Sequence, residues 1–282
     1  MLLSIELPEA QVLAKQMNKE LRGKQVRTCQ MQNSQKLQKV GFINKDLSDF
    51  TRLIDGRIEA VVSRGNVIRV NLDKGMNLIL APEYGGKILY KEKDSMVPPK
   101  FHLKLGFTDD SALIVTLTGM GVIQALRDEE LEHSYVYRRD FSNTASPVND
   151  NEFTYERFSK YLANKSVNIK SVLVGKDAVV VGLSNSTFQD MLYWAGINPR
   201  RKASDLAENE KNRLFDAMKL IIQQRIESGG KDQFTDLYGK EGSYNPAMGP
   251  NMKGKTCAVC GNKVEKLSLG GGQVYYCPEC QH

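Results

Sequence analysis

The chain begins with a helical pattern of apolar positions and then changes to the alternating pattern of strands. Between residues 10 and 22, apolar side chains recur at helical spacing and Gly23 follows as a stop signal; these side chains are Val12, Leu13, Met17 and Leu21. From there to about residue 140 the period shortens to two, interrupted by a helical pattern over 45–55. The first half therefore predicts a β-rich domain with flanking helices.

The second half of the chain has a period of 3.6. Residues 141–151 are polar and contain Pro147, which indicates a linker. Beyond it, three amphipathic helices are predicted over residues 151–165, 184–196 and 208–230. Ser184 or Asn185 is the expected N-cap of the second helix, and glycines end the second and the third.

Four of the five cysteines form two close pairs near the end of the sequence. They have the spacing C-x2-C-x16-C-x2-C and are Cys257, Cys260, Cys277 and Cys280. Two such pairs bring four thiolates to the corners of a tetrahedron, which predicts one structural zinc ion without an open coordination position. Two disulfide bonds are the alternative, and they are rare in a reducing cytosol.

A two-stranded ribbon is predicted between the cysteine pairs. Residues 263–269 and 273–276 alternate like strands, and Gly270–Gly272 suits a hairpin turn. The tip of this hairpin either reaches into a groove of a partner or belongs to a cap that only stabilises its domain.

These patterns together predict an α+β multidomain chain, in which an N-terminal β-sandwich with flanking helices is followed by a helical domain and a zinc ribbon. The expected ranges are 1–140 for the β-rich domain, 141–151 for the linker, 152–250 for the helical domain and 251–282 for the ribbon.

Composition and charge restrict the function only slightly. With 282 residues, 41% of them hydrophobic, the chain is long enough for two domains and a small module. The net charge of +6 is basic but too small to establish a polyanionic partner. The sequence has no run of about 18 apolar residues that would predict a membrane span. The opening "MLLSIELPEA" lacks the segments of a secretory signal, so we expect a cytoplasmic protein.

Four motifs, in order, resemble the formamidopyrimidine-DNA glycosylase/endonuclease VIII (Fpg/Nei) family. "ELPEA" at 6–10 is similar to the family's opening Glu-Leu-Pro-Glu-Val, and "GLSNSTFQDMLYWAGINPRRKASDL" at 182–206 resembles its helix–two-turns–helix. "IESGG" and "YGKEGSY" resemble the tract that leads to the zinc finger, and "CAVCGNKVEK…YYCPECQ" resembles the finger itself. The resemblance covers nearly the whole chain.

The resemblance implies a DNA repair enzyme that binds damaged double-stranded DNA as a monomer. In that family the DNA lies in the cleft between two domains, and the damaged base is flipped into a pocket because a glycosidic bond inside a duplex is out of reach. The amine of an N-terminal proline attacks the sugar and forms a Schiff base, while the neighbouring glutamate assists proton transfer. Base excision in the cytoplasm, at the nucleoid, is the implied role.

Three positions depart from the family pattern. Ile5, preceded by four residues, stands where the family has its N-terminal proline, and a peptide nitrogen is no nucleophile. Asn66 stands at the position of a catalytic strand lysine and carries no positive charge. Gly272 and Gln273 stand where the finger normally has an arginine, and Gln273 would bind a phosphate less strongly than a guanidinium does.

The resemblance also implies which residues form the site. The expected residues are Glu6 and Glu9 for catalysis, Asn66, Lys170, Asn185 and Gln273 for DNA contacts, and Tyr84 and Met120 as wedges that fill the space of the flipped base. Several of these assignments have a plainer alternative, and Glu9 is more often structural. Glu6 or Asn185 could be only a helix cap, Lys170 could be a solvated lysine, and each wedge residue could pack on its own loop.

Three functions are therefore open. The preferred one is a glycosylase without Schiff-base lyase activity, in which Glu6 activates water or stabilises positive charge on the sugar, so that the strand stays uncut. The second is a catalytically inactive protein that binds damaged or distorted DNA. The third is a zinc-ribbon protein that binds RNA or another protein, and the helix–two-turns–helix motif argues against it.

Overall fold

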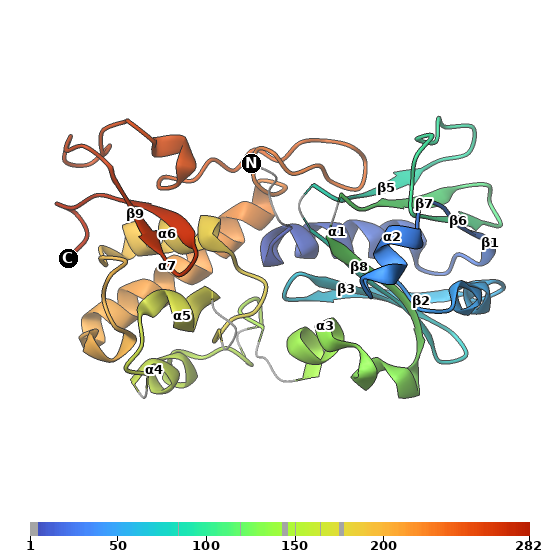
Figure 1. The fold of residues 1–282 in the computed structure, drawn as a ribbon, viewed down its shortest axis with the longest axis horizontal. Helices are drawn as coiled ribbons and strands as arrows, with labels where there is room; N and C mark the ends of the chain where they lie inside the picture. The colour runs from blue at the N-terminus through green and yellow to red at the C-terminus, as the bar shows by residue number, and fades with distance from the viewer. Residues whose placement is uncertain are drawn as a thin grey trace. The chain divides into compact units, whose positions relative to one another are not determined.

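The computed structural model describes residues 5–83, 85–118, 120–142, 146–149, 151–163, 165–174 and 178–282. The chain forms two compact units (Figure 1). The N-terminal unit consists of Met1–Asn143 and Ser228–Ser243, and the helical unit consists of Thr144–Glu227 and Tyr244–His282. No helix in the described part of the chain is long and apolar enough to cross a membrane.

Helix α1 (Leu7–Leu21) starts three residues before the apolar pattern begins. Glu6 is its N-cap and forms a capping box with Glu9. The two carboxylates accept hydrogen bonds from backbone N–H groups at the start of the helix, which have no partner within the helix itself. Pro8 in the first turn suits a position where no backbone N–H is needed. The apolar face of α1 packs on strands of both sheets of the N-terminal unit, which places the start of the helix beside the sheets.

Two four-stranded antiparallel sheets form the N-terminal unit, as the alternating pattern predicts. One has the order β1-β6-β7-β5, with strands Val26–Met31, Leu103–Phe107, Ala112–Thr116 and Lys87–Lys91. The other has the order β2-β3-β4-β8, with strands Ile58–Arg64, Val67–Leu72, Met76–Pro82 and Gly121–Arg127. Helix α2 (Gln35–Lys39) and the 3₁₀ helix Leu47–Leu53 lie between the first two strands along the chain.

The expectation of β structure up to about residue 140 is wrong for the last part of that range. The chain there forms a 3₁₀ helix (Asp128–His133), helix α3 (Tyr135–Tyr137) and a π-helical turn (Arg138–Ser142). Apolar side chains of this segment pack on a cluster of the second sheet; they are Leu131, Val136, Tyr137 and Phe141. Tertiary packing on the sheet therefore outweighs the local pattern.

The helical unit contains the predicted amphipathic helices. They are α4 (Tyr155–Ala163), α6 (Asn185–Ala195) and α7 (Glu208–Glu227), with the short α5 (Ile169–Val174) before α6. Ser184 caps α6 through a hydrogen bond from the Ser186 N–H, and Gly196 ends it in a left-handed conformation with φ 69°. The short 3₁₀ turns Ala203–Asp205 and Pro250–Met252 flank α7 and the ribbon along the chain.

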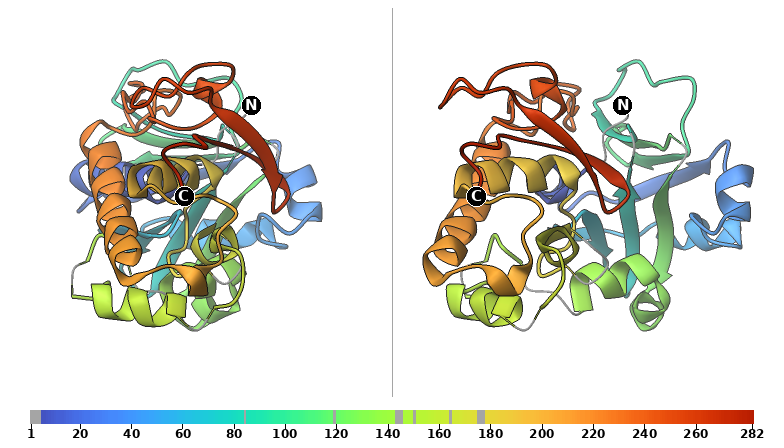
Figure 2. Two further views of the ribbon diagram at one scale, coloured as in Figure 1. Left: turned by 90° about the vertical axis from the view of Figure 1, so that its left-hand side faces the viewer. Right: turned by 60° about the vertical axis from the view of Figure 1, so that its left-hand side comes forward.

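Strands β9 (Glu265–Leu269) and β10 (Gly272–Tyr276) form the predicted antiparallel ribbon. Figure 2 shows this hairpin as a twisted ribbon near the C-terminal end of the chain. Its β10 strand contacts α6. The chain is thus α+β, with N-terminal sheets, a helical unit and a cysteine-rich ribbon, and this confirms the predicted fold class.

One segment of the expected helical domain (152–250) packs elsewhere. Ser228–Ser243 leaves α7 and joins the N-terminal unit. There the Leu237 carbonyl accepts a hydrogen bond from the Tyr90 N–H of β5, and the Leu237 N–H donates to Gln16 of α1. The segment Ser228–Ser243 therefore lies against helix α1 and strand β5.

Candidate functional site

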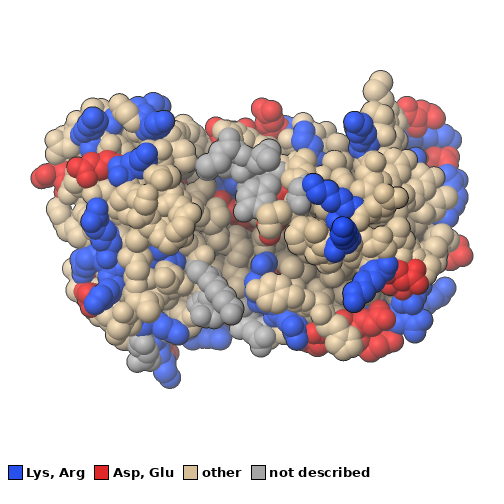
Figure 3. Space-filling view, in the orientation of Figure 1, with Lys and Arg blue, Asp and Glu red and all other residues tan. Residues whose placement is uncertain are grey.

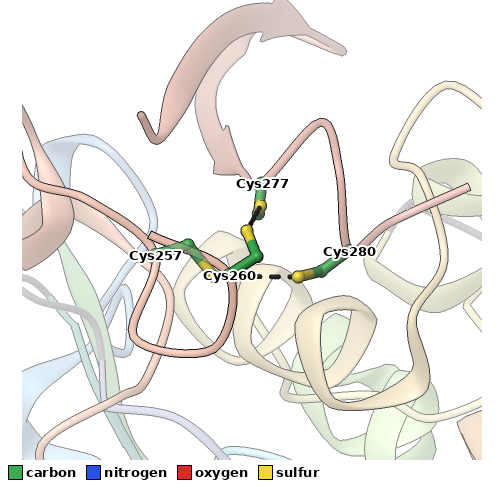
Figure 4. Close-up of side chains that lie close together, drawn as sticks. All are labelled: Cys257, Cys260, Cys277 and Cys280. Carbon is green, nitrogen blue, oxygen red and sulfur yellow. Dashed lines mark hydrogen bonds between the residues drawn. The ribbon is translucent and has the colours of Figure 1, made fainter. Parts of the chain in front are cut away.

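The four cysteines of the ribbon converge on one point (Figure 4). The Sγ atoms of Cys257 and Cys280 lie 3.8 Å apart, those of Cys260 and Cys277 lie 3.4 Å apart, and no disulfide joins them. All four sulfurs lie within 4.8 Å of one another. Sulfurs at tetrahedral corners about 2.3 Å from zinc are about 3.8 Å apart. The cluster therefore fits one structural zinc ion, as the sequence predicts.

A hydrogen bond from Tyr193 favours the thiolate form of Cys257. The Tyr193 hydroxyl lies 3.3 Å from Cys257 Sγ. Burial raises the pKa of the Cys257 thiol, but hydrogen bonds from Tyr193 and from the backbone N–H groups of Cys260 and Val259 outweigh burial and lower this pKa to about 6. Because the thiolate is the form that binds a metal, these hydrogen bonds favour metal binding by Cys257, whereas burial raises the pKa of Cys277 and the hydrogen bond to Cys260 raises the pKa of Cys280.

Two glutamine side chains fasten the ribbon to the helix–two-turns–helix through hydrogen bonds with backbone groups. Gln189 on α6 accepts a 2.7 Å hydrogen bond from the Tyr275 N–H of β10. The buried Gln281 donates to the Ile197 carbonyl at 3.0 Å and accepts from the Cys277 N–H at 2.8 Å. The ribbon and the two-turn motif are therefore one structural block.

The tip of the ribbon lies on two of the predicted DNA-contacting residues. Lys170 Nζ donates to the Leu269 carbonyl at 2.6 Å, and the Asn185 side-chain amide donates to the Gln273 carbonyl. The Gln273 side chain is exposed and donates to Ser268 at 3.2 Å. The structure thus brings Lys170, Asn185 and Gln273 together, although they are far apart in the sequence.

Glycines at the tip permit this close approach. A Cβ atom on Gly272 would lie 3.2 Å from Lys170 Nζ and 3.5 Å from Asn185 Nδ2. Lys170 is buried, and burial lowers the pKa of its ammonium group. The Oδ1 atom of Asn185 is buried without a hydrogen-bond partner among the described residues. Figure 3 shows Lys and Arg side chains gathered over the visible face of the helical unit, with few Asp and Glu among them.

A buried group of charged side chains lies at the N-terminus of α1. Glu6 and Glu9 are 1% and 0% exposed, and the Glu6 N–H donates to Glu9 Oε2 at 3.1 Å. Lys231 Nζ lies 3.3 Å from Glu6 Oε1, and the Lys231 backbone N–H donates to Glu9 Oε1 at 3.2 Å. Glu6 is therefore both the helix cap and the partner of a buried ammonium group.

Sequence reasoning missed Lys231. The residue follows Gly229 and Gly230 directly, but its partner Glu6 lies 225 positions away. No local period or spacing links positions so far apart. A lysine between a glycine pair and a polar loop does not by itself indicate a functional residue. Its role can be inferred only once Ser228–Ser243 is seen to pack in the N-terminal unit.

Close backbone contacts hold the Lys231 segment in place. A Cβ atom on Gly242 would overlap the backbone of Gly230 and Lys231. A Cβ atom on Gly230 would overlap the ring of Phe234 and lie 3.1 Å from Glu9 Cγ, and Gly230 has a φ of 97°. The glycines are therefore required by space as well as by backbone conformation.

We expect Gly230→Ala to destabilise the N-terminal unit more than Gly229→Ala does. Both positions have positive φ, 97° and 69°, but a Cβ on Gly229 would meet no atom within 4 Å. The shared backbone strain costs about 1–2 kcal/mol, and the added overlap at Gly230 about 1–3 kcal/mol more. Urea unfolding of the two variants measures the difference, and equal losses would contradict the packing shown for Gly230.

Asn66 lies in the turn between β2 and β3, next to a guanidinium group. Arg139 donates to Asn66 Oδ1 at 2.6 Å, and the Asn66 N–H donates to Asp140 Oδ2 at 3.1 Å. Burial raises the pKa of the Asp140 carboxyl, although the Arg139 guanidinium opposes the rise. Asn66 itself is uncharged, as the sequence indicates, but Arg139 brings a positive charge to the same turn. The sequence did not point to Arg139, because it lies 73 positions from Asn66.

One of the two predicted wedge residues lies among the described residues. Met120 precedes β8 and is 44% exposed, so its side chain does not pack into the core of its own unit. Tyr84 lies outside the described residues.

Models of one protein family match three successive parts of the chain. The formamidopyrimidine-DNA glycosylase N-terminal domain matches residues 5–118, the H2TH domain of the same enzymes matches residues 145–236, and the zinc finger found in FPG and IleRS matches residues 254–282. These ranges cover both carboxylates, the two-turn motif and the cysteine cluster.

Curated relatives are similar over nearly their whole length. Formamidopyrimidine-DNA glycosylases of Streptococcus mutans and Pelotomaculum thermopropionicum are each 28% identical to this chain over 98% of both sequences. The fold is similar to that of Lactococcus lactis Fpg solved with DNA containing N7-benzyl-Fapy-dG, with a TM-score of 0.84 and 21% identity over 98% of this chain and 99% of that one. The chain therefore belongs to the formamidopyrimidine-DNA glycosylase/endonuclease VIII (Fpg/Nei) family.

Proposed function

We propose that this protein is a DNA glycosylase that binds damaged duplex DNA, flips the damaged base out of the helix and releases it with water. The observation that carries the proposal is the buried carboxylate of Glu6, held at the start of α1 beside Lys231. The curated relatives are named formamidopyrimidine-DNA glycosylases, and similar folds have been solved with DNA containing an abasic site, which supports the same substrate class.

Glu6 is suited to the chemistry at the sugar. A base inside a duplex has to be extruded before its glycosidic bond can be reached. As the bond breaks, positive charge develops on the deoxyribose, and a carboxylate in a buried site stabilises that charge or takes a proton from the attacking water. The Ile5 nitrogen belongs to a peptide bond and cannot replace the water as nucleophile. The expected product is an abasic site in an uncut strand.

The helical unit is suited to hold the DNA backbone. Lys170, Asn185 and Gln273 lie together, and the exposed side-chain amide of Gln273 offers N–H donors to a ligand. Ammonium and amide groups contact phosphate oxygens without reading the base sequence. The zinc ion supports this contact indirectly, since it fixes the base of the β9–β10 hairpin.

The proposal predicts nicks that depend on alkali. Duplexes that carry an oxidised purine, an oxidised pyrimidine or uracil are incubated with the protein, and half of each sample then receives hot alkali, which cuts at abasic sites. We expect cut strands only in the alkali-treated half, and none with the undamaged duplex. Products are resolved on denaturing gels.

Two other outcomes would contradict this proposal. No cut in either half, together with a gel shift of the same duplexes, would favour the inactive damage-binding protein. Strands cut before alkali would mean that the protein has a lyase activity of its own.

A further inference from the structure

Lys231 is an unusual residue for a protein interior. Among the described lysines only Lys231 and Lys170 are buried, and Lys231 keeps 5% of its surface exposed. Lysine is almost never fully buried unless it is paired. A buried ion pair is often no more stabilising than apolar residues of the same size. Fold stability alone therefore gives little reason for a lysine at this position.

The place of Lys231 suggests a chemical role. Its Nζ lies 3.3 Å from Oε1 of Glu6, the carboxylate that is placed at the reacting sugar in the proposed function. Removal of a base leaves a deoxyribose that opens to an aldehyde at C1′. A lysine amine condenses with an aldehyde to form an imine, and a neighbouring acid-base group accelerates the proton transfers.

We propose that Lys231 captures the abasic product as an imine. This inference rests on the proposed glycosylase function. It assigns imine formation with the sugar to the side-chain amine of Lys231. The imine holds the aldehyde while the strand remains uncut, and hydrolysis of the imine later releases the abasic DNA and restores the amine.

Glu6 can accept and return the protons that imine formation requires. The Lys231 ammonium group gives one proton to the Glu6 carboxylate across the 3.3 Å contact. The neutral amine attacks C1′ of the open sugar and, after a proton moves from nitrogen to oxygen, forms a carbinolamine. Glu6 returns its proton to the carbinolamine hydroxyl, which leaves as water. A protonated C1′=N bond and an ionised Glu6 remain.

Contacts with neighbouring residues fix the backbone of Lys231, whereas its four-carbon side chain is flexible. The Lys231 N–H is bound to Glu9, and the Gly242 backbone packs directly on the Gly230–Lys231 peptide. These contacts anchor the Cα atom at the first turn of α1. The four-carbon side chain can then swing from Glu6 to the sugar without a change in the fold. The buried surroundings also limit the water that would hydrolyse the imine early.

Borohydride trapping tests this proposal. The full-length zinc-loaded protein is mixed with a duplex that carries one abasic site, and sodium borohydride reduces any imine to a stable amine. We expect a covalent protein–DNA adduct on a denaturing gel. Digestion and mass spectrometry should place the sugar remnant on the peptide that contains Lys231.

A matched pair of variants separates Lys231 from other amines. Lys231→Arg keeps a positive charge but removes the nucleophile, and its adduct should fall to background. Lys240→Arg changes an exposed lysine of the same segment, and its adduct should equal that of the wild type. The mapped wild-type peptide decides the matter even if Lys231→Arg folds poorly.

The possible results distinguish this inference from the proposed function. An adduct on Met1 or on any other lysine would overturn it. Release of damaged bases without any trapped adduct would also overturn it, but would leave the glycosylase proposal standing. Absence of both base release and DNA binding would overturn both proposals.

Discussion

Cys277→Ser is expected to release the β9–β10 hairpin and to weaken DNA binding by at least about 3 kcal/mol, roughly a hundredfold. A structural zinc site contributes about 10–16 kcal/mol of apparent binding free energy to the fold of its module. A two-stranded hairpin alone is marginally stable in water. Without it, Lys170 and Asn185 lose their partners on β9 and β10. Each hydrogen bond to a charged phosphate contributes about 1.5–3 kcal/mol, and at least two would be lost.

The measurements are hydrogen exchange across residues 254–282 and a gel-shift titration at fixed salt. Cys29→Ser is the matched control, because Cys29 lies on β1 outside the cluster, and burial raises its pKa to about 12. Its ribbon and its DNA affinity should equal those of the wild type. A chelator should reproduce the Cys277→Ser result. Unchanged DNA affinity in the metal-free protein would mean that the ribbon takes no part in binding.

Glu6→Gln is expected to lower the rate of base release by about 10²–10⁴-fold, the usual contribution of general acid–base catalysis. Glutamine keeps the shape of the side chain and an oxygen for the helix cap, but it removes the charge. The change also leaves the Lys231 ammonium group without the carboxylate that now lies 3.3 Å away. Breaking a buried ion pair on one side destabilises a fold by about 3–5 kcal/mol.

Two further variants separate the loss of activity from the loss of stability. In Glu6→Gln/Lys231→Met both charges of the Glu6–Lys231 pair are gone, so stability should recover while base release stays low. Asp46→Asn changes another N-cap carboxylate, one that accepts a hydrogen bond from the Ser48 N–H on a 3₁₀ helix of the same unit. It should release bases at the wild-type rate. Single-turnover assays and urea unfolding give the two quantities, and an active Glu6→Gln would leave Glu6 as a cap only.

The site illustrates the difference between local and distant information. The cysteine spacing predicts a zinc cluster because each knuckle is built from residues three positions apart. The capping box of α1 joins Glu6 and Glu9, which are also three positions apart. In contrast, the Asn66–Arg139 and Glu6–Lys231 contacts span 73 and 225 positions. Neither pair leaves a period or a spacing in the sequence.

Sequence alone determined the three amphipathic helices of the second half, the strands of the first half, the metal ligands and the family resemblance, because each depends on short-range periodicity or on motifs of a few residues. Tertiary structure decided where the segment Ser228–Ser243 packs, and therefore which amine meets Glu6. It also made Asp128–Ser142 helical, since apolar side chains there pack on the second sheet. These features depend on surfaces that exist only after distant parts of the chain have folded together, and side-chain burial against such surfaces outweighs local propensity.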